Sequence, residues 1–228
     1  TERKTGVGHK DFQFNFSPNV TLEEDLERRD LTINSMALDE NGNLIDPFNG
    51  AKDIENKCFR PVSQAFFEDP LRALRVARFK AQFPEFFLHE SMEQALFKIS
   101  ASNELLNLSS ERVWGEVVKG LGHDFHQFLQ IIKNYTLHEP WFNKLSKIPD
   151  INSDIAEIKW CEVSQANEFK FAMCLDIPKS YSKQLLLWKK FFNYDKNGDV
   201  SYKVKFFEDF SKNNLPDAVF TLQFFKDI

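Results

Sequence analysis

The sequence contains few cysteines and no long apolar run. Its 228 residues include only three cysteines, Cys58, Cys161 and Cys174, an odd number without the spacing of a metal site. These cysteines argue against a disulfide framework and against zinc, and they are typical of a protein from a reducing cytosol. No apolar stretch approaches the roughly 18 residues that a membrane-spanning helix needs. We therefore predict a cytoplasmic protein with no membrane partner.

A start methionine and a leader are also missing. The chain begins with Thr1, and no charged segment followed by an apolar one comes after it. We expect no signal peptide, and we expect this chain to be a part of a longer protein.

Arginine is absent from the second half of the chain. The last one is Arg112, and lysine carries all later positive charge. The net charge of -5 excludes a surface coated with positive charge, so a nucleic acid would have to be bound locally. Arginine offers a rigid fork for phosphates and base edges, whereas lysine is a solvated point charge. We therefore expect the chemistry in the first half and a scaffold in the second.

The residues that are present predict an α+β fold that is mostly α, with 42% apolar residues to form a core. Alternation of phenylalanine with polar residues over 12–16 predicts a strand, and a second short strand is expected over 43–48 between two Asn-Gly turns. Thr21 and Glu24 form a capping-box pattern that predicts a helix over 22–38. From residue 68 onward the pattern is helical, and after the first helix the predicted ranges are 90–101, 110–120, 124–134, 155–175 and 182–192.

Two of the predicted helices carry unusual polar residues. In the helix over 22–38, Arg29 falls inside the apolar arc and Asp30 at its edge, so we expect Arg29 to be paired with a carboxylate or with a ligand's phosphates. In the helix that follows Asp69, one side consists of small apolar residues. Steps of three residues place the charged side chains in one stripe on the other side, namely Asp69, Arg72, Arg75 and Arg78.

Each of these residues also has a purely structural interpretation. Asp69 before Pro70 is typical of a helix cap, and the arginine stripe of a solvated charged face. Asp30 could pair with Arg28 or Lys10, and Asn34 could be a core amide. The two remaining carboxylates of this region are expected to order the turn and to pair with a base such as Arg60; they are Asp46 and Asp53. No metal site and no catalytic residue is predicted within this chain.

The motifs together resemble the class II tRNA nucleotidyltransferases, the CCA-adding enzymes, and their poly(A) polymerase relatives in the nucleotidyltransferase superfamily. The resemblance covers about residues 1–118. The ordered motifs that carry it are Thr1-Glu2-Arg3-Lys4, Arg28-Arg29-Asp30-x-x-x-Asn34, Asp46-Pro47-Phe48-Asn49-Gly50, Val62-Ser63-x-Ala65-Phe66, Glu68-Asp69-x-x-Arg72 and Glu111-Arg112-Val113-Trp114.

This resemblance implies an activity and a set of nucleotide-binding residues. It implies template-independent addition of C, C and A to the 3′ end of tRNA, with CTP, ATP and tRNA as partners. It implies that Arg29 and Asp30 hold the phosphates and ribose of the nucleotide, with Asn34 in support. Asp69 and Arg72 would read the base edge of cytosine or adenine. Further contacts with the nucleotide would come from Arg75 and Arg78.

The resemblance also implies domains and a cofactor. We expect the end of a nucleotidyltransferase head over 1–60, a helical neck over 61–121 and a helical, tRNA-binding body over 122–228. The family binds Mg²⁺ through a glycine-rich loop and an Asp-x-Asp pair, which this chain lacks, so we expect the chain alone to be inactive. A poly(A) polymerase of the same superfamily and a non-catalytic RNA-binding protein on the same scaffold remain alternatives.

Overall fold

The computed structural model describes residues 2–4, 12–14, 20–193 and 197–211. The chain divides into two compact units, Thr1–Asp176 and Ile177–Ile228. Helices dominate the described residues of both units, which confirms the α+β, mostly α fold class. No helix in the described ranges combines the length and the apolar character needed to cross a membrane.

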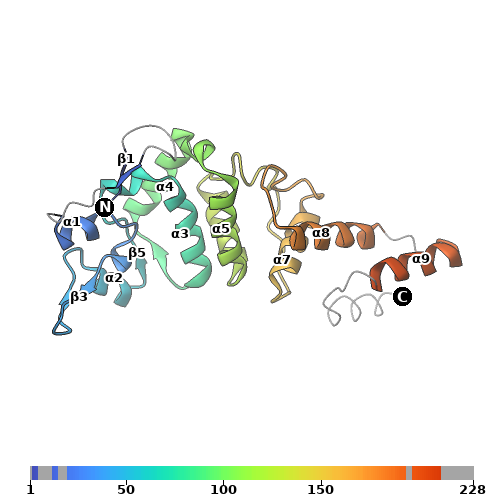
Figure 1. Cartoon of the computed structure of the whole chain (residues 1–228), viewed down its shortest axis with the longest axis horizontal. Coiled ribbons are helices and arrows are strands. Elements are labelled where there is room, and N and C mark those ends of the chain that lie inside the picture. Colours follow the sequence, from blue (N-terminus) through green and yellow to red (C-terminus); the bar gives the residue numbers. More distant parts are fainter. Residues whose placement is uncertain (1, 5–11, 15–19, 194–196, 212–228) are drawn as a thin grey trace. The chain divides into compact units, whose positions relative to one another are not determined.

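The strands of the first unit form small pairs (Figure 1). Strands β1 (Glu2–Lys4) and β2 (Phe12–Phe14) are antiparallel, as are β3 (Ala37–Leu38) and β4 (Leu44–Ile45). Strands β5 (Cys58–Phe59) and β6 (Phe87–Leu88) pair in parallel. The expected strands over 12–16 and 43–48 are thus present as shorter segments, and residues 15 and 16 lie outside the described residues.

The predicted helix over 22–38 is wrong beyond its first six residues. Helix α1 (Leu22–Glu27) begins with the predicted capping box, in which Glu24 N donates to Thr21 Oγ1. The chain then leaves the helix and makes only a short 3₁₀ turn, η1 (Thr32–Asn34). The carboxylate of Asp30 accepts from the backbone N–H of Leu31, a local bond that competes with helical hydrogen bonding. The spacing of the apolar residues is helical, but the side chain of Asp30 binds the backbone, and the chain forms a 3₁₀ turn in place of a longer α-helix.

The next segment contains a short helix that the sequence did not predict, α2 (Gly50–Glu55). The carboxylate of Asp46 accepts from the amides of Gly50 at 2.7 Å and Ala51 at 2.9 Å. Asp53 accepts from Arg60 at 3.0 Å, so the structural roles expected for both carboxylates are confirmed. A side chain at Gly50 would lie 2.2 Å from the carbonyl oxygen of Thr32, so this close approach requires glycine.

The remaining helices largely follow the predicted ranges, except three that were not predicted. In the first unit they are η2 (Gln64–Glu68), α3 (Leu71–Gln82), α4 (Glu90–Ser102), η3 (Glu104–Asn107), α5 (Ser110–Leu121), α6 (Phe125–Asn134) and α7 (Ala156–Ala166). The second unit contains α8 (Lys179–Phe192) and α9 (Val200–Ser211). The three helices without a prediction are η2, η3 and α9. The prediction of one helix over 155–175 is wrong after Ala166. There the side chain of Asn167 accepts from the amides of Ser146 and Lys147, and Glu168 has a positive φ of 57°.

Helix α3 packs against α5 and α6, and Figure 1 shows α3 and α5 side by side. Its small-residue face is fully buried, as predicted, because Ala73, Leu74 and Ala77 have no exposed surface. Helices α5 and α6 approach closely at Gly120, where a Cβ would meet the ring of Phe128 at 2.8 Å. The buried face of α3 fixes the helix, so its opposite face is held rigidly for the site.

Two glycines of α5 offer a matched test of this packing. Gly115→Ala adds its Cβ to open space and improves helix propensity, so the free energy of unfolding should rise by about 0.5–1 kcal/mol. Gly120→Ala forces a methyl group against Phe128 and should lower it by about 1–3 kcal/mol. Urea denaturation of both variants measures the difference. Equal effects of the two substitutions would contradict the close approach of α5 and α6.

Candidate functional site

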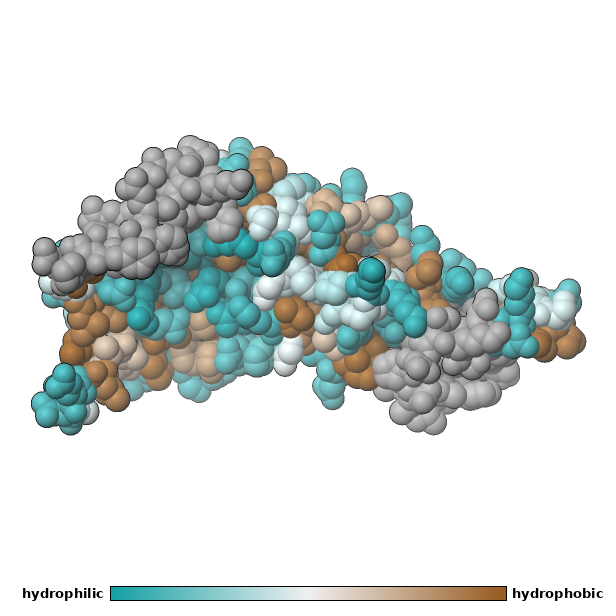
Figure 2. Space-filling model, viewed as in Figure 1, coloured by the Kyte–Doolittle hydropathy of each residue, from teal (hydrophilic) through white to brown (hydrophobic). Residues whose placement is uncertain are grey.

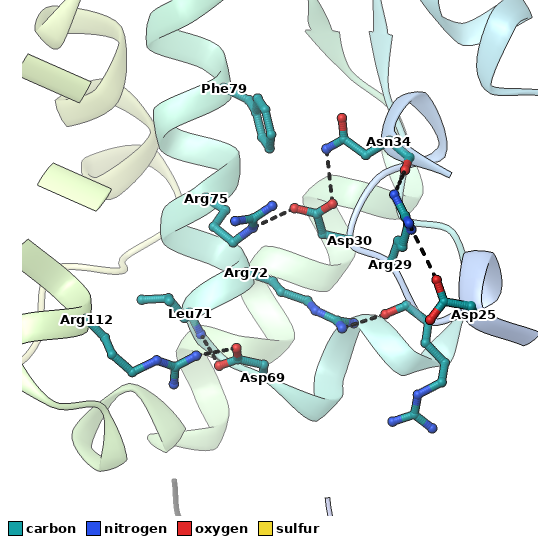
Figure 3. A pocket seen from close by; sticks show the side chains of 11 residues that line it. Asp25, Arg29, Asp30, Asn34, Asp69, Leu71, Arg72, Arg75, Phe79 and Arg112 are labelled. Carbon is teal, nitrogen blue, oxygen red and sulfur yellow. Dashed lines mark hydrogen bonds and ion pairs between the residues drawn. The ribbon is translucent and has the colours of Figure 1, made fainter. Parts of the chain in front are cut away.

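A pocket of about 630 Å³ lies where α3 meets the end of α1 and the η1 turn (Figure 3). Charged side chains dominate its wall. The lining residues are Asp25, Arg28, Arg29, Asp30, Asn34, Asp69, Leu71, Arg72, Arg75, Phe79 and Arg112. Six of the seven predicted binding residues therefore line one pocket, although two of them come from α3 and the rest from segments outside it.

Asp30 is the most buried charged residue of the pocket, with its side chain 5% exposed. One carboxylate oxygen accepts from Arg75 Nε at 2.7 Å, and the other accepts from the Asn34 amide at 3.1 Å. Burial acts to raise the pKa of Asp30, but the charge of Arg75 and these hydrogen bonds outweigh it and hold the pKa below its ordinary value. Asp30 therefore pairs with Arg75, whereas Arg28, one of the two expected partners, pairs with Glu68; the other, Lys10, lies outside the described residues.

Arg72 is held by backbone carbonyls. Its Nη1 donates to the carbonyl oxygen of Ala65 and its Nη2 to that of Arg28, both at 2.6 Å. Burial lowers the pKa of this guanidinium, an effect that the nearby charges of Asp30 and Asp69 oppose. The two carbonyls fix the position of the guanidinium group in the pocket wall.

Asp69 lines the pocket just before α3. The N-cap of this helix is Pro70, one residue later than the predicted cap Asp69. Oδ1 of Asp69 still accepts from the backbone N–H of Leu71, the first residue of the helix, at 3.1 Å. Its Oδ2 is bound by Arg112 Nη2 at 2.6 Å (Figure 3). The sequence alone predicted no role for Arg112. The available signal was that Arg112, the last arginine of the chain, lies in one of the family motifs.

A second residue that the sequence analysis left out is Arg28. Its guanidinium pairs with the Glu68 carboxylate, and the two side chains are 19% and 32% exposed. This pair joins the end of α1 to the segment just before Asp69. A contact between residues 40 positions apart could not be read from either motif alone.

Arg29 lies at the rim of the pocket and not in an apolar core. Its side chain is 48% exposed, pairs with Asp25 at 3.4 Å and donates to the carbonyl oxygen of Asn34 at 3.0 Å. The expectation that Arg29 lies in an apolar arc is wrong because the helix ends before it. The guanidinium is paired with a carboxylate, as expected, but solvent reaches both partners.

Arg78 stands apart from the pocket lining. It donates to Glu116 on α5 at 2.7 Å, and its guanidinium lies 3.9 Å from the centre of the Phe79 ring. Glu116 is buried and also accepts from Lys119 at 3.1 Å. Arg78 thus joins α3 to α5, and its role as a nucleotide contact stays a prediction.

The visible surface is divided by polarity (Figure 2). Hydrophilic residues cover much of the face over α3, whereas hydrophobic residues gather near β3 and β4, where Leu38 and Leu44 are exposed. Within the described residues, no group of three or more histidine, cysteine, aspartate or glutamate side chains could hold a metal ion. The lining of this pocket, which lies within the described residues, contains no such group.

Comparisons with known proteins agree with the motifs. A family described as the Poly A polymerase head domain matches residues 2–60. The multifunctional CCA protein of Hahella chejuensis is 40% identical over 216 residues, which are 87% of this chain and 51% of that protein. The CCA-adding enzyme of Buchnera aphidicola is 49% identical over 155 residues, or 66% of this chain and 35% of that enzyme.

Solved structures show the same fold. The crystal structure of the Bacillus stearothermophilus CCA-adding enzyme in complex with CTP has a TM-score of 0.60 and 25% identity, and the match covers 82% of this chain and 50% of that one. The chain is thus similar to the class II tRNA nucleotidyltransferases of the nucleotidyltransferase superfamily. Members of this superfamily generally use a divalent metal ion. The chain spans about half the length, or less, of the curated relatives described above.

The Asp30–Arg75 pair gives a prediction about pH. Asp30→Asn leaves Arg75 without its buried partner and should lower the free energy of unfolding by about 1–3 kcal/mol at pH 7. Because the folded pKa of Asp30 is depressed, this contribution is present above the ordinary value of 3.8 and is lost as pH falls through the folded pKa.

Urea denaturation between pH 3 and 7 tests this expectation. The difference between wild type and Asp30→Asn should shrink below about pH 4. Asp25→Asn is the control, because it removes an exposed carboxylate and should change stability by no more than about 0.5 kcal/mol. A pH-independent difference for Asp30→Asn would show that the substitution disturbs packing and not the ion pair.

Proposed function

We propose that the protein containing this chain adds C, C and A to the 3′ end of tRNA, with CTP and ATP as substrates and no nucleic-acid template. One observation carries this proposal: a single pocket brings the Asp69 and Arg72 pair together with Arg29 and Asp30. The sequence relatives and the CTP-bound structural neighbour described above support it.

Asp69 and Arg72 have the chemistry to select the base. Cytosine and adenine both present an exocyclic amine next to a ring nitrogen that accepts a hydrogen bond, whereas uracil and guanine invert this order. An ionised carboxylate can only accept, and a guanidinium can only donate. In this assignment Asp69 accepts from the amine and Arg72 donates to the ring nitrogen.

The other end of the pocket suits the phosphates and ribose. Arg29 is half exposed and makes a long ion pair with Asp25, so exchanging this partner for a phosphate costs little. Asp30 and Asn34 are fixed by hydrogen bonds to Arg75 and to each other, and the assignment gives them the ribose. The guanidinium fork of Arg29 matches phosphate geometry in a way that lysine does not.

Domains and cofactor complete the proposal. We assign residues 1–60 to the head, 61–121 to the neck and 122–228 to a tRNA-binding body, and the head match over 2–60 supports the first boundary. Mg²⁺ is the proposed metal, held by residues outside this chain. The proposed location is the cytoplasm.

The test uses the intact protein, tRNA lacking its CCA end, and CTP or ATP supplied separately and together. The proposal expects two C additions followed by one A. Addition of many A residues without C would support the poly(A) polymerase alternative. RNA binding without any nucleotide addition would support the non-catalytic alternative. The 228-residue chain by itself should not incorporate nucleotides.

Arg72 should determine base choice. In the intact protein, Arg72→Lys keeps a positive charge but loses the fork that faces the base, so UMP and GMP misincorporation should rise by about 5- to 100-fold relative to CMP and AMP. Thermal melting should accompany the assay, because Arg72 also binds two backbone carbonyls. An unchanged nucleotide preference in a folded variant would contradict the base-reading role.

Arg78→Lys is the matched comparison for Arg72. Arg78 lies on the same helix but outside the pocket lining, where it pairs with buried Glu116. This variant should lower stability and leave the ratio of misincorporated to correct nucleotides unchanged. A changed ratio would instead place Arg78 among the residues that read the base.

Arg29 should serve the phosphates and not the fold. Because its side chain is 48% exposed, Arg29→Lys should shift the melting temperature of the nucleotide-free protein very little. Loss of the bidentate fork should weaken CTP and ATP binding together, by a similar factor of about 5 to 50. A large loss of stability with normal affinity for both nucleotides would assign Arg29 to the fold.

A further inference from the structure

A second pocket, of about 800 Å³, lies next to the first and has no part in the roles assigned above. Arg28 lines both pockets, so the end of α1 forms a wall between them. Three segments supply the second pocket: the end of α1, residues 60–68 and helix α4. The side chains that matter for its chemistry are those of Gln64, Phe67, Gln94 and Lys98.

The surface of this pocket suits a nucleobase. The ring of Phe67 lies edge-on to the buried Phe66 ring, with centroids 6.0 Å apart and an interplanar angle of 88°, which fixes its plane. Lys98 Nζ lies 4.1 Å from the centre of the Phe67 ring. The amides of Gln64 and Gln94 provide both donors and acceptors near this ring. A flat ring for stacking, with amides that can meet a polar edge, is how proteins bind unpaired bases.

The charges of the pocket distinguish an RNA nucleotide from a free triphosphate. Both arginines that line it have carboxylate partners, since Arg28 pairs with Glu68 and Arg60 pairs with Asp53 at 3.0 Å. A further carboxylate, that of Glu27, also lines it. Among the described residues that line this pocket, Lys98 is thus the cation that contacts an aromatic ring and not a carboxylate. One such cation fits a single phosphodiester and is too little for three phosphates.

The second pocket is also connected to the base-reading residue of the first. Arg72 donates to the carbonyl oxygens of Ala65 and Arg28, and both of these residues line the second pocket. A ligand that shifts either of these two carbonyl oxygens would therefore also shift the Arg72 guanidinium. The two pockets share Arg28, and Arg72 of the first pocket is hydrogen-bonded to two residues of the second. Adjacent pockets of this kind suit two nucleotides that are to be joined in one strand.

We propose that the second pocket binds a nucleoside unit of the RNA strand whose 3′ end is extended, with its base on the Phe67 ring and its phosphate at Lys98. The base takes the place of the Lys98 ammonium over the ring, and the ammonium moves to the adjoining phosphate. This inference rests on the proposed function, because it takes the RNA from it.

The test uses the intact protein and the variants Phe67→Leu and Lys98→Gln, with tRNA lacking its CCA end. The KM for RNA should rise by about 5- to 100-fold in Phe67→Leu, since stacking on an aromatic ring is lost. The KM for CTP should stay within about twofold of wild type if only RNA contacts change. Lys98→Gln should reduce the slope of log Kd for RNA against log salt concentration by about 0.7, the value for one phosphate contact on a single strand.

Two matched controls lie outside both pockets. Phe97→Leu shortens an exposed aromatic of the same helix α4, and Lys119→Gln removes an exposed lysine on α5. Neither should alter the KM for RNA or the salt dependence. Thermal melting of all four variants checks that they are folded. Because the side chain of Lys98 is exposed, Lys98→Gln should fold normally, and it keeps the test valid if Phe67→Leu destabilises the protein.

Two outcomes would overturn the inference. An unchanged KM for RNA and an unchanged salt slope would show that the pocket does not bind RNA. A raised KM for CTP or ATP with a normal KM for RNA would assign the pocket to a free nucleotide. If the wild-type protein does not extend RNA, the proposed function fails. Fluorescence anisotropy then measures the RNA affinities of wild type, Phe67→Leu and Lys98→Gln. These affinities show whether the second pocket binds RNA, even without nucleotide addition.

Discussion

The ion pair between Asp30 and Arg75 holds the candidate site together. It joins a segment with little regular structure to the rigid helix α3, across 45 positions of sequence. Asp30 is almost fully buried, so its charge is tolerated only because Arg75, Asn34 and the Leu31 amide bind it. Together with the bond from Arg72 to the carbonyl oxygen of Arg28, this pair makes the residues after α1 face the arginines of α3. Helix α3 can act as the fixed side because its other face is packed against α5 and α6.

The sequence predicted the regular elements well where apolar periodicity and the backbone agree. The helices over 90–101, 110–120 and 124–134 were predicted to within a residue or so of their ends. The helix over 22–38 failed because the apolar residues keep a helical spacing after α1 ends, while polar side chains bind the local backbone. Thr32 shows the competition clearly: its N–H donates to the carbonyl oxygen of Arg60, in place of a partner within a helix, and its hydroxyl donates to Asp53.

The sequence predicted which residues form the candidate site, but it did not predict which of them form ion pairs. Motifs identified six residues that line one pocket, yet they did not indicate that Arg28 pairs with Glu68 or that Arg112 pairs with Asp69. Each of these contacts joins residues at least 40 positions apart, and their geometry depends on how α1, α3 and α5 pack. The same reason explains why the ion pair of Arg78 with Glu116 was not predicted. The place of Arg78 in the stripe of α3 was read correctly, but the packing of α5 brings Glu116 to it.

The partners of Asp69 explain why a carboxylate can read a base under the proposed function. A carboxylate only accepts, so it can bind an amine and not a carbonyl oxygen. In this pocket Oδ1 of Asp69 accepts from the Leu71 amide, and Oδ2 accepts from Arg112. Each carboxylate oxygen retains a second lone pair for a ligand. Arg112 and the first turn of α3 thus fix the carboxylate in the wall of the pocket, where it can accept from a base that offers an amine.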